Sequence, residues 1–159
     1  MAAWVNINPP PGTVILQINY AGTPTVTFNV TAAQMGNGTP VAGTPALEFE
    51  MSVQRAGGTN VTATMTATAP ANLSSGGSQI PISDIGWTSA AIAGAPGGTT
   101  VIPNGSFIGG PQTIVSITTA GGGNYNAGGV LTFRFANTTV YPGGTYGPAT
   151  VYYTAGRNP

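Results

Sequence analysis

Residues 46–54 read ALEFEMSVQ, and residues 61–68 read VTATMTAT. In both stretches apolar and polar side chains alternate with a period of two, which is the pattern of a β-strand that buries one face. The first strand is expected to point Leu47, Phe49, Met51 and Val53 inward and Glu48 and Glu50 outward. In the second strand four threonines face away from Val61, Ala63, Met65 and Ala67. These two strands set the expectation of an all-β fold.

The alternation continues in both directions from these strands. It covers residues 14–20, 25–31, 112–118, 130–136 and 145–154, and residues 80–87 form an apolar cluster broken by a proline. Turns rich in Gly, Asn and Pro separate roughly eight or nine segments at intervals of about 8–12 residues, which predicts a β-sandwich of immunoglobulin-like or jelly-roll type. The large apolar residues expected in its core, or in an acceptor groove, are Phe28, Phe49, Met51, Trp87, Phe133, Phe135, Val151 and Tyr153.

Charge is almost absent from this chain. Only six of the 159 side chains are charged, and there is no lysine, histidine or cysteine. The residues that usually carry acid–base, metal and thiol chemistry are therefore scarce, so we expect no enzyme activity, no metal and no cofactor. No basic patch is present for nucleic acid or anionic lipid. The composition favours a function in surfaces and assembly.

The charged residues have structural interpretations. Glu48 and Glu50 could bind calcium weakly or act as a glycosidase pair, but two acids on one strand are expected to form a solvated face. Asp84 is expected to cap a turn or to pair with an arginine. Arg134 is expected to project outward and to pair with a glutamate or to stack on tyrosines in a subunit contact. Trp4 and Trp87 are expected in core and contact positions.

Three segments together resemble the major subunits of chaperone–usher pili. They are residues 80–88 (IPISDIGWT), residues 130–137 (VLTFRFAN), and a terminal YPGGTY turn at 141–146 that runs into the alternating residues 149–154. The resemblance covers about residues 45–159 and is strongest to the cysteine-free alternate (CFA/I-like) class and the archaic, spore-coat-U-like class.

The resemblance implies an extracellular fimbrial protein of the bacterial surface that serves adhesion or biofilm formation. Its partners would be identical subunits in a fibre, a periplasmic chaperone and an outer-membrane usher during assembly, and a host or abiotic surface. The sandwich would be an incomplete immunoglobulin-like fold, completed by a strand from the next subunit. Residues 1–4 have no basic start and no long apolar stretch, so a secreted form requires a signal peptide that this sequence does not contain.

The residues themselves are compatible with such strand donation. No lysine protects the sheet edges, and the chain ends a few residues after its last expected strand. We predict an N-terminal extension at 1–22 and a sandwich domain at 23–159. The expected donor strand presents Val14, Leu16, Ile18 and Tyr20, with Val5 and Ile7 as a second candidate set. Alternatively, residues 13–20 are the first strand of a closed sandwich.

Two other functions are compatible with the same fold class. One is a carbohydrate- or surface-binding β-sandwich, such as a lectin-like domain or a fibre-tip adhesin. The other is a jelly roll from a phage capsid or appendage. The row of Thr62, Thr64, Thr66 and Thr68 resembles the flat arrays of ice-binding proteins, but it is expected to be an ordinary outward strand face.

Overall fold

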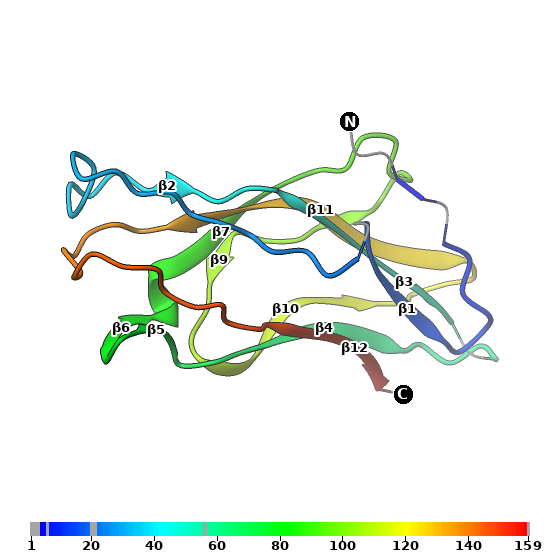
Figure 1. The fold of residues 1–159 in the computed structure, drawn as a ribbon. Helices are drawn as coiled ribbons and strands as arrows, with labels where there is room; N and C mark the ends of the chain where they lie inside the picture. The colour runs from blue at the N-terminus through cyan, green and yellow to red at the C-terminus, as the bar shows by residue number, and fades with distance from the viewer. Residues whose placement is uncertain (1–3, 6, 20–21, 56, 159) are drawn as a thin grey trace.

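The computed structural model describes residues 4–5, 7–19, 22–55 and 57–158 (Figure 1). Two sheets make up most of the fold, and the prediction of an all-β chain is confirmed. Every strand pairing in them is antiparallel except that of β8 with β11, which is parallel. The larger sheet has seven strands, five of them in the order β1-β3-β11-β7-β9, with β2 and β8 paired to β11. The smaller sheet has the order β10-β4-β12, and β5 and β6 form a separate hairpin.

The strands of the larger sheet are β1 (Val14–Ile18), β2 (Val41–Ala42), β3 (Leu47–Gln54), β7 (Ile85–Ala90), β8 (Thr100–Val101), β9 (Gly105–Ser106) and β11 (Asn124–Phe135). Those of the smaller sheet are β4 (Thr62–Ala69), β10 (Gly110–Thr118) and β12 (Tyr152–Asn158). The hairpin consists of β5 (Asn72–Ser75) and β6 (Ser78–Pro81), and a 3-10 turn, Ile82–Asp84, precedes β7.

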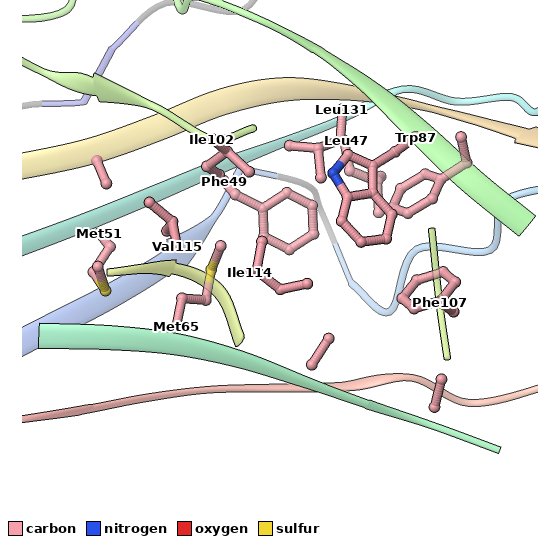
Figure 2. Close-up of a cluster of buried hydrophobic side chains, with 14 of the residues drawn as sticks. Leu47, Phe49, Met51, Met65, Trp87, Ile102, Phe107, Ile114, Val115 and Leu131 are labelled. Atoms are coloured by element: carbon pink, nitrogen blue, oxygen red, sulfur yellow. The ribbon is translucent and has the colours of Figure 1, made fainter. Parts of the chain in front are cut away.

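The core lies between the two sheets, where the alternating strands meet face to face. Figure 2 shows side chains of β3, β4 and β10 that point into this space. Phe49 is fully buried and its ring lies 4.7 Å from that of Tyr153, so the contact joins the larger sheet to β12. Ala63, Ala67 and Ala69 of β4 are buried too, and their small side chains leave room for the aromatic residues opposite. A register shift between Thr113 and Val115 turns two consecutive residues of β10, Ile114 and Val115, into the core.

Two expected strands differ from the observed ones. Residues 25–31 make only an isolated bridge, Thr27 to Thr44, although Val26, Phe28 and Val30 do pack against the core as predicted. The last strand begins at Tyr152 and not at residue 145. Pro148 has no backbone N–H for a ladder and Gly147 has a φ of 95°, so regular pairing is interrupted before Ala149.

The N-terminal residues are packed on the sandwich. In this structure β1 pairs with β3 of its own chain along five residue pairs, and the division into 1–22 and 23–159 stays a prediction. The described residues before β1 also lie on the larger sheet, through hydrogen bonds to Glu50, Gln54 and Ala93. Residues 1–3, 6 and 20–21 of the predicted extension lie outside the described residues.

Because Phe49 joins the two sheets, we expect Phe49→Ala to lower the free energy of unfolding by about 3–5 kcal/mol, through lost burial and the cavity left behind. Urea denaturation followed by tryptophan fluorescence measures this change. Tyr152 is 67% exposed, so the matched variant Tyr152→Ala should change the unfolding free energy by no more than about 0.5 kcal/mol. Equal effects of the two variants would contradict the proposed packing.

Candidate functional site

The edge of the smaller sheet is the first candidate site. β12 pairs with β4 on one side, and no strand pairs with its other side within the part of the chain that the structure describes. β1, the edge strand of the larger sheet, lies near β12 across this flank of the sandwich. In Figure 1 the extended segment 23–31 runs lengthwise from the region of β1 toward the loops at the far left. The flank is therefore bordered by the edge strands β12 and β1 and by one irregular segment.

Apolar side chains along this flank are only half-buried. They come from β1, from the segment after it, and from β12 with the residue before it, and they all pack against the core. Burial raises the pKa of the Tyr153 hydroxyl above its ordinary value, so the ring stays neutral. The set comprises Val14, Leu16, Ile18, Val26, Phe28, Val30, Val151, Tyr153 and Ala155.

The predicted donor residues lie in their own chain. Val14, Leu16 and Ile18 are opposite Val53, Met51 and Phe49 of β3. Tyr20, the fourth predicted donor residue, lies outside the described residues. In this single chain the segment is thus the edge strand of the larger sheet, as expected for the first strand of a sandwich, because its alternating side chains find the same core that Phe49 fills. Donation of this segment to a neighbour stays a prediction.

The other predicted groove and core residues are distributed over both layers. Phe49, Met51, Trp87, Phe133 and Phe135 are buried in the core cluster, whereas Phe28, Val151 and Tyr153 are half-buried at the flank. The sequence therefore predicted the inward face of each residue. It did not separate the closed core from the partly open flank.

The outer face of the larger sheet holds a second candidate site, which sequence analysis missed. The described residues of the segment 4–9, which are 4–5 and 7–9, run across β3 on the side opposite the core. The N–H of Trp4 donates to the carbonyl of Ala93 (3.1 Å), and the N–H of Val5 donates to Oε1 of Glu50 (3.0 Å). Farther along, Nδ2 of Asn124 donates to Oδ1 of Asn8 (2.7 Å). Ile7 and Pro9 are buried there, while Val5 remains 46% exposed.

Glu48 and Glu50 lie beneath this segment, and the expectation that they form a solvated face is wrong. They do point away from the core, but their exposed fractions are 3% and 0% because the N-terminal residues and Asn19 cover them. Nδ2 of Asn19 donates to Oε1 of Glu48 (2.6 Å) and to Oε1 of Glu50 (2.8 Å). Oε2 of each glutamate is buried without a hydrogen-bond partner. Burial raises the pKa of Glu50, and the adjacent Glu48 raises it further.

One glycine of β11 could have indicated, from the sequence, that another segment covers this face. Gly128 lies opposite Glu50, and a Cβ added to it would come within 2.9 Å of the Trp4 ring, the Ile92 side chain and the carbonyl of Phe49. Glycine inside a strand often marks the close approach of another segment.

Asp84 and Arg134, the other charged residues considered above, each make a side-chain hydrogen bond with an uncharged partner. Oδ2 of Asp84 accepts a hydrogen bond from the hydroxyl of Tyr141 (2.8 Å), whereas a turn cap or an arginine partner was predicted. Arg134 is exposed, as expected, and its Nε donates to Oγ1 of Thr88 (3.3 Å) rather than to a glutamate.

The outer face of the smaller sheet is rich in hydroxyl groups. The threonines of β4 form its centre, flanked by Thr113, Ser116 and Thr118 of β10 and by Thr154 of β12. Some of these hydroxyls bond to one another, as in Thr62 to Thr118 (2.8 Å) and Thr64 to Ser116 (3.3 Å). A pocket on this face is lined by threonines together with Ala155, Gly156 and Arg157. Thr62, Thr64, Thr66 and Thr68 thus lie on an outward strand face, as predicted.

No family model, curated protein or solved structure matches this chain. Among the described residues, no helix has the length and apolar character needed to cross a membrane. The same residues contain no cluster of three or more His, Cys, Asp or Glu side chains that could hold a metal ion.

Since the space above Gly128 is filled, we expect Gly128→Ala to displace residues 4–9 and to lower the free energy of unfolding by about 1–3 kcal/mol. The measurement combines urea denaturation with Trp4 fluorescence. Gly156 has no atom within 4 Å of an added Cβ, so Gly156→Ala is the matched control and should leave both readings unchanged. A Gly128→Ala protein with native Trp4 fluorescence would contradict the close approach.

Proposed function

We propose that this protein is a structural subunit that polymerises by strand addition into an extracellular surface fibre. In this mode, an N-terminal segment of one copy pairs with the free edge of β12 in the next copy. Main-chain hydrogen bonds supply affinity in such a contact, and alternate side chains entering the flank supply specificity. The free edge of β12 is the observation that carries the proposal.

The strand order supports this assignment. The constant-type immunoglobulin fold places its strands in the orders A-B-E-D and C-F-G. The order β1-β3-β11-β7 corresponds to A-B-E-D, and β4-β12 corresponds to C-F, with β10 added on the far side of β4. The position of strand G, beside β12, has no occupant among the described residues. A strand from a neighbour would fill this place.

The apolar side chains of the flank and its lack of charge also favour strand addition. Val151, Tyr153 and Ala155 are half-buried, so a strand laid against β12 would remove more apolar area from water, worth about 25 cal/mol per Å². Proteins commonly protect free edges with lysine or other charges. β12 carries Arg157 near its end, and the whole sequence has no lysine. Each new ladder bond adds a net contribution of about 0.5–1.5 kcal/mol.

The two candidate donor segments differ in the free energy needed to release them from their own chain. Moving β1 would exchange its ladder with β3 for one with β12 and would expose the edge of β3. Residues 4–9 are held by fewer backbone bonds, and Val5 is already half-exposed. Their pairing with β12 would create a ladder that is absent from the single chain. This argument favours the set of Val5 and Ile7 over Val14, Leu16 and Ile18.

The partners follow from this assembly. They are identical subunits and, as the sequence resemblance to chaperone–usher pilins implies, a chaperone and an usher that keep the flank covered until assembly. A neutral fibre wall rich in threonine would face the medium, where adhesion or biofilm contacts form.

The test changes Val5, a side chain that is half-exposed in the monomer and would be buried against the flank of the next copy in the fibre. We expect the intact chain to form polymers on concentration and Val5→Asn to stay monomeric, because a polar group would enter the apolar flank. Size-exclusion chromatography and negative-stain electron microscopy measure this.

Val101 is 44% exposed, so Val101→Asn is the matched control and should polymerise like the intact chain. Unchanged polymerisation of Val5→Asn would contradict the assignment of residues 4–9 as the donor. An intact chain that remains monomeric at all concentrations would contradict strand addition itself.

A further inference from the structure

The buried carboxyl pair is unusual because no cation among the described residues forms an ion pair with it. Its neighbours on β1 are Gln17 and Asn19, and on β11 they are Gly128 and Val130, all uncharged. The covering residues, Trp4 and Val5, are uncharged too. On the same face of β11, Arg134 lies four residues beyond Val130, which is about 13 Å along the strand. Two full negative charges in such a place would be strongly disfavoured.

A single shared proton would give a hydrogen bond to both unpartnered Oε2 atoms. Gln17 donates to Oδ1 of Asn19, and this contact turns Nδ2 of Asn19 toward the two Oε1 atoms. Each Oε1 therefore has a donor, whereas each Oε2 has none. A carboxylic acid O–H on one glutamate could donate to the carboxylate of the other, because the Oε1 atoms of both groups contact the same Nδ2 of Asn19 and the carboxyl groups are therefore neighbours.

We propose that Glu48 and Glu50 share one proton in the folded chain, and that this protonated pair latches residues 4–9 onto the outer face of the larger sheet. The latch acts through the N–H of Val5, which donates to Oε1 of Glu50, and through the burial of both carboxyl groups beneath the segment. When the proton leaves, two adjacent carboxylates repel each other and require water. Water reaches them when residues 4–9 lift away.

The direction of the pH dependence follows from burial beneath the segment, which is the largest cause of the raised pKa of Glu50. The N–H of Val5 acts the other way and lowers this pKa, but the net shift is upward. A carboxyl whose pKa is higher in the folded state binds its proton more tightly there than in the unfolded chain. The stabilising contribution is therefore complete at acidic pH below the ordinary value of 4.5 and is lost as pH rises through the raised value. For a one-proton release, the ratio of open to closed segment grows by at most about tenfold per pH unit.

The latch would regulate the candidate donor. Only this consequence rests on the proposed function: release of residues 4–9 frees the segment that would pair with β12 of a neighbour, so rising pH would promote assembly. The latch itself is a property of the monomer and can be measured without any fibre.

The experiment is amide hydrogen exchange of the dilute monomer between pH 4 and 8, read at Trp4 and Val5 and corrected for intrinsic exchange rates. Protection of both amides should fall by up to about tenfold per pH unit above the raised pKa of Glu50. In Glu50→Gln, the side-chain oxygen still accepts from Val5 and the new N–H group can donate to Glu48. We expect this variant to keep residues 4–9 protected across the whole range.

Glu48→Gln serves as a second variant with the same expected result, should Glu50→Gln fold poorly. Asp84→Asn removes the remaining carboxylate side chain at a distant position and should keep the pH dependence of the parent.

Protection that is constant with pH in the parent, or an unchanged pH profile in both glutamine variants, would overturn the latch. Saturable recovery of protection at pH 8 by calcium alone would also overturn it, because the pair would then be a cation site. Failure of polymerisation with a functioning latch would leave the latch intact and reject only the fibre.

Discussion

A sheet edge exposes backbone N–H and C=O groups that pair with another strand when one is within reach. In this protein the outer edge of β12 is such an edge, and the described residues provide no strand for it. The half-buried side chains beside it follow from this gap, because Val151 and Tyr153 contact the core on one side only. The core between the two sheets is closed around Phe49, which is fully buried. Strand addition is the assembly mode that this combination favours.

Scarcity of charge connects the edge to the covered outer face. Without lysine, the edge of β12 lacks the usual protection against pairing. Without a nearby cation among the described residues, Glu48 and Glu50 depend on Asn19, on the N–H of Val5 and, as we propose, on a shared proton. The same six-charge composition thus underlies both proposals, strand addition at the edge of β12 and the pH-sensitive latch. Residues 4–9 take part in both, as cover for the carboxyl pair in the monomer and as the proposed donor in the fibre.

Period-two alternation was sufficient to predict the all-β class and the inward faces of β3, β4 and β12, but not the bulge that buries Ile114 and Val115 of β10. It could not predict partners, because alternation specifies which face of a strand is buried and not which strand lies beside it. Val14, Leu16 and Ile18 therefore had two compatible places, and in the single chain they lie on β3. Glu48 and Glu50 were misplaced for a related reason. A carboxylate on an outward face is normally solvated, and the crossing of residues 4–9 depends on a long-range contact signalled only by Gly128.

The most direct measurement of the central claim is a cryo-electron-microscopy reconstruction of the assembled fibre, with the chain traced through β12 and the N-terminal residues. Strand addition predicts a further strand hydrogen-bonded to the outer edge of β12, continuous with the N-terminus of the adjacent copy. A reconstruction in which that edge faces solvent, and residues 4–18 of every copy remain on their own larger sheet, would contradict it.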